Sequence, residues 1–311
     1  MYIIEKAKQF IRDKEWRKYF FIRLSDRIFH YSDRKYLEHL FYAKNGYSPN
    51  FDDPKTICEK LNWLKLYNRR PEYTAMVDKY EVKKYVAEKV GKQYIVPLLG
   101  VYNSFNEIDF DSLPEQFILK CTHNSGSFVV CKDKRTFDKE NARKILSNGL
   151  NQNYFNAGRE WVYKDVKPRI IAEEFIPALG ARDSLEYKLT VCNGIVKMIT
   201  ICTGIAHSSF ENRNNDNYDR DWNFLPFYVN YKNTGKVIDK PAFMDEMIDV
   251  AEKLGAGIPY VRVDFYYVDG KVLFGEMTFY TWSGFMHFTP PEYDQIMGEW
   301  IQLPQKFNEL E

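Results

Sequence analysis

The sequence predicts an α+β fold whose strands pair mainly as antiparallel hairpins. Helix-like and strand-like segments are mixed along the chain. Two pairs of strand-like segments flank Asn193-Gly194 and Asp269-Gly270, and these dipeptides are strong signals of hairpin turns. Hydrophobic residues make up 45% of the 311 residues, which is enough for a buried core and too many for a disordered chain.

Charge, hydropathy and cysteine content exclude several classes of protein. The net charge of +1 gives no strong attraction to nucleic acid or to an anionic membrane. No apolar stretch approaches the roughly 20 residues that span a bilayer, and residues 1–10 carry charge too early for a secretory signal. The five cysteines form no C-x-x-C pair, so we expect no zinc site, no disulfides and a cytoplasmic location.

Residues 1–75 form a predicted helical N-terminal region that is rich in basic and aromatic side chains. Within 2–24, apolar residues such as Phe10 and Phe20 are interspersed with Lys and Arg. One interpretation is a helix that packs on the body of the protein. The other is a basic-aromatic surface that contacts a polyanionic glycan or the inner face of a membrane.

Residues 76–168 are predicted to form a first subdomain. Its helices are expected at 77–90 and 137–150, and its strands at 94–102, 117–121 and 128–132. The last two strands flank a polar loop, 122–127.

Residues 169–311 are predicted to form a second subdomain built around two hairpins. A buried strand at 169–176 precedes the hairpins, and a helix at 242–255 lies between them. The hairpin strands are expected at 187–191 with 195–201, and at 260–267 with 271–279. A polar insert, about 206–236, also separates the hairpins and is interpreted as a mobile loop.

The last hairpin carries the clearest group of chemically active side chains, which are Arg262, Asp264, Glu276 and Thr278. Two carboxylates on adjacent strands can chelate Mg²⁺, which prefers carboxylate, phosphate and water oxygens. The alternative is an ordinary surface ion pair between Arg and Glu across the two strands.

The register of this hairpin decides whether the two carboxylates meet, because side chains alternate between faces along a strand. A strict two-residue turn would place Asp264 opposite Gly275 and Glu276 on the other face. A three-residue loop at 268–270, closed by a G1 bulge, places Asp264 opposite Phe274 and all four polar side chains on one face. We predict the three-residue loop, because glycine suits the left-handed bulge position.

Lys120 ends a strand just before the loop 122–127, whose sequence Thr-His-Asn-Ser-Gly-Ser is rich in small residues. Backbone N–H groups and hydroxyls of such a loop can bind phosphate oxygens, while the lysine neutralises their charge. The alternative is a solvated hairpin tip. His123 could polarise a substrate, although a single loop histidine more often only forms hydrogen bonds.

Three further features are weaker signals when each is taken alone. Lys188 lies on a strand between apolar neighbours, where its burial requires an anion such as a phosphate or a structural carboxylate. The apolar strand 170–176 contains Glu173 and Glu174, as in a hinge that binds adenine through backbone groups and ribose through a carboxylate. Lys79 lies on a charged helix face.

The order of these features along the chain resembles the ATP-grasp superfamily. It is most similar to the teichuronopeptide-biosynthesis (TupA-like) ATP-grasp family of bacterial surface-polysaccharide loci. The similar stretches span about 75–285 and are DKYEVKKYVAEKVGKQYIVPLLGVY, LPEQFILKCTHNSGS, IIAEEFI, EYKL and VRVDFYYVDGKVLFGEMTF. The resemblance implies an ATP-grasp fold, in which two α+β subdomains grip ATP between antiparallel sheets.

The resemblance also implies roles for individual residues. The phosphates of ATP would be held by Lys79, Lys120 and Lys188 and covered by Ser125, Gly126 and Ser127. The adenine hinge would be Glu173, Glu174, Phe175 and Ile176. Mg²⁺, expected as two ions, would be bound by Asp264 and Glu276. The catalytic residues would be Arg262, Lys188 and Lys120, with Arg262 stabilising the acyl phosphate.

The chain departs from the family pattern at three points. Thr278 stands where many ATP-grasp enzymes have Asn, which puts a third metal contact in doubt. Glu186 stands where the family often has Asp before Tyr-Lys. The phosphate-covering loop has fewer glycines than the superfamily norm.

The function implied by the resemblance is an ATP-dependent ligase that joins a carboxylate to an amine through an acyl phosphate. We expect the carboxylate to be a uronic acid and the amine an amino acid, in capsule or cell-surface polysaccharide biosynthesis. The reverse pairing, an amino-acid carboxylate with an amino sugar, stays open. The loop 122–127 and the insert 206–236 are candidate lids that exclude water.

Two other functions stay open. A glycosyltransferase of a surface-polysaccharide pathway would use Asp219-Arg220-Asp221 to hold a metal-bound sugar nucleotide. A scaffold that binds ATP without turnover would use the same lysines and carboxylates as the ligase. No feature predicts nucleic acid as a partner, and none predicts a transmembrane segment.

Overall fold

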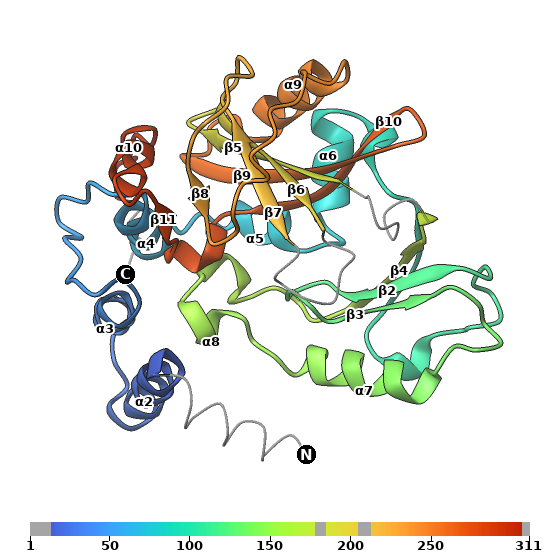
Figure 1. The fold of residues 1–311 in the computed structure, drawn as a ribbon. Helices are drawn as coiled ribbons and strands as arrows, with labels where there is room; N and C mark the ends of the chain where they lie inside the picture. Colours follow the sequence, from blue (N-terminus) through green and yellow to red (C-terminus); the bar gives the residue numbers. More distant parts are fainter. Residues whose placement is uncertain (1–13, 178–184, 205–212, 307–311) are drawn as a thin grey trace.

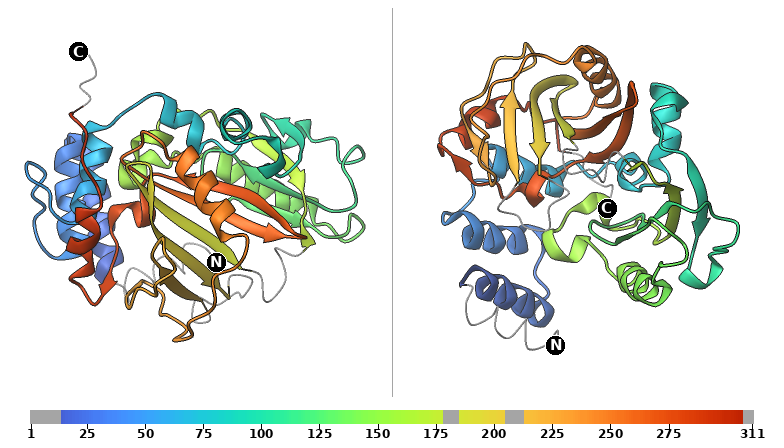
Figure 2. Two further views of the ribbon diagram at one scale, coloured as in Figure 1. Left: turned by 90° about the horizontal axis from the view of Figure 1, so that it is seen from above. Right: turned by 45° about the vertical axis from the view of Figure 1, so that its right-hand side comes forward.

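Two antiparallel sheets face one another in the computed structural model, which describes residues 14–177, 185–204 and 213–306 (Figure 1). Helices α7 (Lys139–Leu150) and α9 (Met244–Leu254) lie on the outer sides of the two sheets (Figures 1 and 2). Helices from the N-terminal part of the chain pack beside the larger sheet. This arrangement confirms the predicted α+β class.

The smaller sheet has the strand order β1-β4-β2-β3. Its strands are β1 (Leu98–Tyr102), β2 (Phe117–Cys121), β3 (Phe128–Cys131) and β4 (Ile170–Glu174). Phe117, Leu119 and Ala172 pack with Leu146 of α7 in one buried cluster. Because side chains alternate along a strand, the other face of this sheet carries Lys120 and Glu173 toward the larger sheet.

The larger sheet has the strand order β10-β9-β5-β6-β7. Its strands are β5 (Glu186–Cys192), β6 (Ile195–Thr203), β7 (Asn214–Tyr218), β9 (Tyr260–Val268) and β10 (Lys271–Thr278). The buried side chains of Leu189 and Val263 belong to the main core, which also includes Met247 of α9. The opposite face carries Lys188 and Asp264 toward the smaller sheet.

Among the residues that the structure describes, five α-helices precede the first strand. They are α2 (Lys14–Phe29), α3 (Asp33–Asn45), α4 (Ile57–Tyr67), α5 (Glu72–Val77) and α6 (Val82–Lys89). Helix α4 begins with a capping box, in which Thr56 accepts the amide of Glu59 and Glu59 accepts the amide of Thr56. Helix α4 thereby starts at a fixed point against α10 (Tyr293–Glu299), which packs on it.

The helix predicted at 77–90 is divided into α5 and α6 by a turn at Asp78. The carboxylate of Asp78 accepts the amide of Tyr80 at 2.8 Å, and the carbonyl of Asp78 accepts the amide of Val82 at 3.0 Å. A short acidic side chain that bonds to the following amides favours a turn over a helix interior. The predicted boundaries at residues 75 and 168 stay predictions, and β4 pairs with strands that precede 168.

Short elements complete the fold. They are α8 (Phe155–Gly158), the paired strands β8 (Tyr228–Val229) and β11 (Phe288–Thr289), and the 3₁₀ turns η1 (Lys92–Tyr94), η2 (Phe105–Glu107), η3 (Trp161–Tyr163) and η6 (Thr281–Gly284). The turn η6 follows β10 directly and contacts α4.

Part of the insert that was expected to be a mobile loop is a strand instead. Strand β7 pairs with β6, and the amide side chain of Asn217 accepts the hydroxyl of Thr200 at 2.8 Å and donates to the carbonyl of Phe227 at 3.0 Å. Residues 205–212 lie outside the described residues. The prediction is therefore wrong for 214–218, because the amide groups that suggested a loop are paired inside the sheet.

Candidate active site

Asp264 and Glu276 face each other directly across β9 and β10. The predicted register is wrong in its details: the turn has two residues, and the irregularity lies between Phe274 and Glu276. Asp269 and Gly270 have φ of 51° and 78°, which suits a two-residue hairpin turn. The bulge at Gly275 then shifts the pairing by one residue and brings both carboxylates to one face.

The bulge depends on a close approach of backbone to backbone. A Cβ at position 275 would lie 3.1 Å from the carbonyl oxygen of Asp264, which is tighter than ordinary contact. Glycine at this position therefore allows the register that the candidate site requires. Thr278 pairs with Arg262 in the same register, so the predicted shared face of the four polar side chains is observed.

Arg262 lies at the centre of this group. Its guanidinium donates two hydrogen bonds of 2.6 Å to the carboxylate of Asp264, one of 3.3 Å to Glu276 and one of 3.1 Å to Thr278. Burial alone would lower the pKa of Arg262, but the carboxylate of Asp264 outweighs it and raises the pKa. The arginine is a permanent cation between the two acids.

Lys188 approaches the same carboxylate from β5. Its ammonium lies 2.8 Å from Asp264 and 2.8 Å from Glu186. Burial opposes the charged form of both partners, yet the neighbouring charges prevail: the pKa of Lys188 is raised, and Arg262 and Lys188 lower the pKa of Asp264. Lys188 therefore has structural carboxylate partners, which was one of the two interpretations left open for it.

A second cluster of charges lies on the inner face of the smaller sheet. Glu173 is buried on β4, and its carboxylate lies 2.8 Å from Lys120 of β2 and 2.5 Å from Lys83 of α6. Burial would raise the pKa of Glu173, but the ammonium groups of Lys120 and Lys83 lower it. Glu174 is exposed, so its carboxylate is the accessible one of the predicted hinge.

Lys83 was not predicted from the sequence. A signal was available, because Lys79 and Lys83 are four residues apart and would share one face of the predicted helix 77–90. In the structure Lys79 lies in the turn before α6 instead. Lys83 also donates to the carbonyl of Val96 at 2.9 Å, which fixes its ammonium beside Glu173.

Lys79 connects the two charge clusters. Its ammonium donates to the carbonyl of Asn124 at 2.7 Å. Burial lowers the pKa of Lys79, while the charge of Glu276 opposes this shift and that of Lys120 adds to it. The ammonium of Lys79 is thus within electrostatic range of Glu276 and of Lys120.

The loop 122–127 is anchored in its first half. Thr122, His123 and Asn124 are buried, and the ring of His123 bonds to the carbonyls of Gly149 and Gln152 at 3.1 Å each. Burial lowers the pKa of His123. This histidine has the hydrogen-bonding role that was the alternative to substrate polarisation.

The second half of that loop is open to solvent. Ser125 and Gly126 are exposed, Ser127 is half-buried, and Gly126 has a φ of 85° that favours glycine. The amide of Cys121 donates to the carbonyl of Ser127 at 2.9 Å and closes the loop at its base. Only this tip, rather than the whole loop, is suited to move over a ligand.

The remaining hinge residues follow β4 directly. Phe175 and Ile176 are half-buried, and the ammonium of Lys132 lies 6.0 Å from the centre of the Phe175 ring. The amide of Glu174 donates to the carbonyl of Pro97 at 3.1 Å, so this amide is occupied. Residues 178–184 lie outside the described residues.

The acidic triplet Asp219-Arg220-Asp221 serves local structure. The carboxylate of Asp219 accepts the amides of Asp221 and Asn223 at 2.9 and 2.8 Å, and Arg220 lies 2.8 Å from Glu252. These contacts are typical of a turn stabilised by an aspartate side chain. They do not favour a site for a metal-bound sugar nucleotide.

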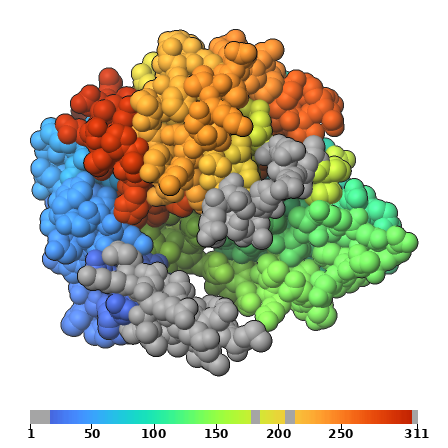
Figure 3. All heavy atoms as spheres, in the orientation of Figure 1, coloured from blue at the N-terminus to red at the C-terminus, as the bar shows by residue number. Residues whose placement is uncertain are grey.

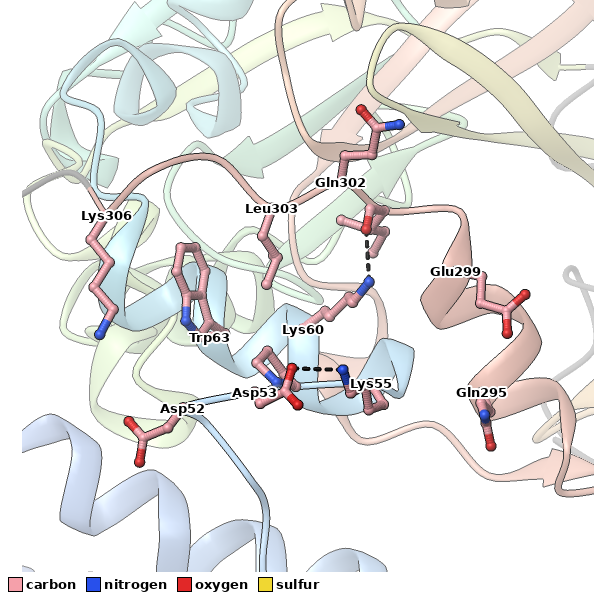
Figure 4. A pocket seen from close by; sticks show the side chains of 12 residues that line it. Asp52, Asp53, Lys55, Lys60, Trp63, Gln295, Glu299, Gln302, Leu303 and Lys306 are labelled. Atoms are coloured by element: carbon pink, nitrogen blue, oxygen red, sulfur yellow. Dashed lines mark hydrogen bonds and ion pairs between the residues drawn. The ribbon is translucent and has the colours of Figure 1, made fainter.

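A separate hollow of about 480 Å³ lies near α4 and α10, away from the two charge clusters (Figure 4). Two of its cations have partners: Lys55 lies 2.7 Å from Asp53, and Lys60 donates to the carbonyls of Gly298 and Ile301 at 2.8 Å each. A third, Lys306, lies 4.3 Å from the ring centre of Tyr67. The residues that line this hollow include none of those predicted for the site. Figure 3 shows all heavy atoms in the orientation of Figure 1, with the yellow to orange segments of the larger sheet above the green segments of the smaller sheet and α7.

The family model that matches the chain is described as TupA-like ATPgrasp and matches residues 59–302, well over half of the chain. The chain belongs to the TupA-like ATP-grasp family. The resemblance inferred from the motifs is thereby confirmed, and with it the predicted ATP-grasp fold. The match includes every residue of the two charge clusters.

Several solved structures are similar to the TupA-like chain over part of their length. They include D-alanine–D-alanine ligases from Bacillus anthracis, complexed with ATP, and from Helicobacter pylori, and an ATP-grasp RimK domain protein from Sphaerobacter thermophilus. In that order the identities are 14%, 16% and 12%, and the TM-scores are 0.38, 0.42 and 0.40.

The coverage of these structures is partial. The same three alignments cover 66%, 81% and 76% of this chain, and 53%, 68% and 70% of the other chain. The chain thus spans about half the length of the Bacillus anthracis ligase. No curated protein matches the chain.

The chemistry of the residues in the two charge clusters fits a nucleoside triphosphate with magnesium. Asp264 and Glu276 would supply two oxygen ligands, and within the part of the chain that the structure describes no group of three or more His, Cys, Asp or Glu side chains could hold a metal. A hard cation would therefore complete its shell with phosphate and water oxygens, as Mg²⁺ commonly does. The lysines of both sheets supply the positive charge that polyphosphate requires.

Proposed function

We propose that the chain is an ATP-dependent carboxylate–amine ligase that works through an acyl phosphate. The observation that carries this proposal is the direct pairing of Asp264 with Glu276, with Arg262 and Lys188 at the same carboxylate. Paired acids surrounded by fixed cations suit a reaction in which a polyphosphate and a carboxylate approach each other.

The proposed roles follow the positions of the side chains. Lys79, Lys120 and Lys188 bind phosphate oxygens of ATP, and the exposed tip of the loop, Ser125, Gly126 and Ser127, covers them. Adenine and ribose bind at Glu173, Glu174, Phe175 and Ile176. Glu174 is the acid suited to ribose, because Glu173 is occupied by two lysines. Asp264 and Glu276 hold Mg²⁺, proposed as two ions.

The proposed reaction has two displacements. An oxygen of the substrate carboxylate attacks the γ-phosphorus of ATP, and the bond to ADP breaks. The amine then attacks the carbonyl carbon of the acyl phosphate, loses a proton, and releases inorganic phosphate. Arg262, a permanent donor beside this site, stabilises negative charge on the acyl phosphate and on the tetrahedral oxyanion. Mg²⁺, when bound, neutralises charge on the phosphate oxygens.

The proposed substrates come from the family resemblance. The carboxylate is a uronic acid and the amine an amino acid, in the biosynthesis of a bacterial capsule or cell-surface polysaccharide. The reverse pairing, an amino-acid carboxylate with an amino sugar, is the second choice. Because acyl phosphates hydrolyse, the reaction must be shielded from water, and the tip at 125–127 is the described segment best placed to do so.

We place the reaction in the cytoplasm, at the inner face of the membrane. Helix α2 exposes Leu24, Ile28 and Phe29 with exposed fractions of 41%, 61% and 67%, and Arg27 is exposed beside them. Apolar and basic side chains on one helix suit a membrane surface with anionic lipids. Within the described residues, no helix has the length and apolar character needed to cross a membrane.

The test of the ligase is ADP release from Mg-ATP, screened across pairs of uronic acids and amino acids. ADP release that requires both a carboxylate and an amine supports the proposal. Glu276→Gln should abolish this turnover and leave the thermal unfolding profile unchanged, because the amide keeps the shape but cannot balance the charge of a metal. Glu115→Gln, at an exposed acid outside both charge clusters, is the matched control and should turn over normally.

One result would contradict the assigned site, and two would contradict the ligase. Full turnover in Glu276→Gln would remove this residue from the site. Binding of a UDP-sugar in preference to Mg-ATP would favour a glycosyltransferase. Tight ATP binding without ADP release for any pair would favour a scaffold.

A further inference from the structure

The turn after β10 has an unusual backbone. Trp282 and Ser283, which are not glycines, both lie in the left-handed region with φ of 51° and 53°, and Gly284 follows with φ of 68°. Side chains at such positions are strained, and the conformation persists only when the surroundings enforce it. Strained backbone of this kind concentrates at functional sites.

A buried lysine from α4 enforces this turn. Lys65 is fully buried, and its ammonium donates to the carbonyl of Ser283 at 2.8 Å, to the hydroxyl of Ser283 at 3.3 Å and to the carbonyl of Gly158 at 2.8 Å. It also donates to the side chain of Asn62 at 3.0 Å. Asn62 in turn donates to the carbonyl of Gly284 at 2.9 Å, so the carbonyls of Ser283 and Gly284 are both held.

The packing around the turn leaves no room for an alternative. A Cβ at Gly158 would lie 2.2 Å from the hydroxyl of Ser283, and a Cβ at Gly284 would lie 2.8 Å from the amide of Asn62. Glu160 is buried close by and opposes the effect of burial, which lowers the pKa of Lys65. The turn is thus held by a buried polar network from three separate elements.

The turn is continuous with the candidate active site. Thr281 is three residues beyond Thr278, which accepts from Arg262, so their Cα atoms are at most about 11 Å apart. The hydroxyl of Tyr260 donates to Thr281 at 2.7 Å. Tyr260 lies two residues before Arg262 on β9, on the same face of the sheet.

The turn presents an aromatic side chain to solvent instead of burying it. Trp282 is 45% exposed, and its ring centre lies 5.7 Å from that of the half-buried Tyr231, with the ring planes at 54°. The exposed part of the Trp282 ring adds no hydrophobic free energy to folding, because it is not removed from water. The exposed ring is therefore available to a ligand.

From this placement we infer that Trp282 and Tyr231 form a subsite for the sugar ring of one substrate, with Lys65 as a positioning residue. A pyranose ring has an apolar C–H face that packs on aromatic rings and hydroxyl edges that accept hydrogen bonds. In this subsite the ring rests on Trp282, and its reacting group extends along the polar face toward Arg262. The inference rests on the proposed function for the identity of the reaction, but the binding itself requires no turnover.

The test is direct binding of two probes, D-glucuronate and D-glucosamine, to the full chain by isothermal titration calorimetry without ATP. At least one probe should bind the wild type. Trp282→Ala should weaken that binding about tenfold, and Trp282→Phe, which keeps a ring, should restore part of it. Tyr42→Ala is the matched control, because Tyr42 is a 59% exposed aromatic residue on α3.

ATP affinity serves as the second readout and should be unchanged in Trp282→Ala. Equal sugar binding by Trp282→Ala and the wild type would overturn the subsite, as would the absence of binding for both probes. If Trp282→Ala lost both ATP binding and sugar binding, the subsite would also be overturned. Trp282 would then maintain the structure of the whole site rather than contact the sugar. Sugar binding that depends on Trp282, in a chain that releases no ADP, would uphold the subsite and contradict the ligase.

Discussion

Glu173 organises the inner face of the smaller sheet. Its buried carboxylate joins Lys120 of β2 to Lys83 of α6, and both contacts are 2.8 Å or shorter. A buried carboxylate without these partners would be costly, whereas one that accepts from two ammonium groups remains charged. One of the two carboxylates of the predicted hinge therefore fixes the lysine proposed to bind phosphate.

Glu173→Gln should make the protein less stable at neutral pH and less sensitive to acid. The folded-state pKa of Glu173 is lowered by Lys120 and Lys83 despite burial, so it lies below the unfolded value of about 4.3. The carboxylate thus stabilises the fold above about pH 4.3, and this contribution is lost as the pH falls through the folded pKa. Breaking the buried pairs should cost about 3 kcal/mol of unfolding free energy at pH 7.

Urea denaturation at pH 7, 5 and 3 measures both effects. Glu174→Gln, the exposed neighbour, is the control and should change the unfolding free energy by less than about 0.5 kcal/mol. If Glu173→Gln lost as much stability between pH 5 and pH 3 as the wild type, the charge assigned to Glu173 would be wrong.

Individual residues differ in how far the sequence could place them. The type and order of Lys188, Arg262, Asp264 and Glu276 predicted that they lie together, and the structure brings them together. The sequence could not tell that Lys188 pairs with Asp264, because that contact depends on which strands of the sheet are neighbours. Lys65 gave no signal, because only the turn at 281–284, distant in sequence, explains its burial.

At the scale of elements, the hairpin of β9 and β10 shows why the shared face of the four polar side chains was predicted correctly from a wrong register. Asp-Gly predicted the hairpin, and the fit of Gly270 to a left-handed position predicted a bulge within a three-residue turn. The bulge lies at Gly275 rather than in the turn, since glycine there allows the close approach to Asp264. Bulge position depends on contacts between strands, which local sequence does not record.

Helix α2 should bind membranes if its exposed face has the proposed role. The wild type should co-sediment with vesicles that contain phosphatidylglycerol and should bind phosphatidylcholine vesicles less well, because Arg27 adds electrostatic attraction. Leu24→Gln with Ile28→Gln should reduce sedimentation about tenfold, since two exposed apolar side chains are removed.

The control for α2 is Tyr42→Gln, at an exposed aromatic residue on α3. It should sediment as the wild type does. Equal sedimentation of the α2 double variant and the wild type would leave α2 as a helix with no membrane role, and the reaction would then belong to the cytoplasm at large.

At the scale of the whole molecule, charged residues from distant parts of the chain lie on the two facing sheets and in the turn before α6. Lys79 and Lys120 come from the first half of the sequence, and Lys188, Asp264 and Glu276 from the second half. The family match over 59–302 extends across both halves. The order of motifs was sufficient to predict this fold, because each motif lies at a strand or loop facing the space between the sheets.

The whole molecule also shows a connection that the order of motifs did not contain. Helix α4, from the N-terminal helical region, supplies Lys65 and Asn62 to the turn that follows β10. The helical region was interpreted as a packing element or a surface for a glycan or membrane. Its contact with the turn makes it part of the site's support as well.

The central claim, transfer of phosphate to a carboxylate, is tested most directly with a substrate whose carboxylate carries oxygen-18. The experiment uses whichever carboxylate and amine support ADP release, and mass spectrometry reads the inorganic phosphate. An acyl phosphate leaves one carboxylate oxygen on the released phosphate, so the account predicts one oxygen-18 atom for each ADP formed. Phosphate that carries no label while the amide accumulates would contradict it.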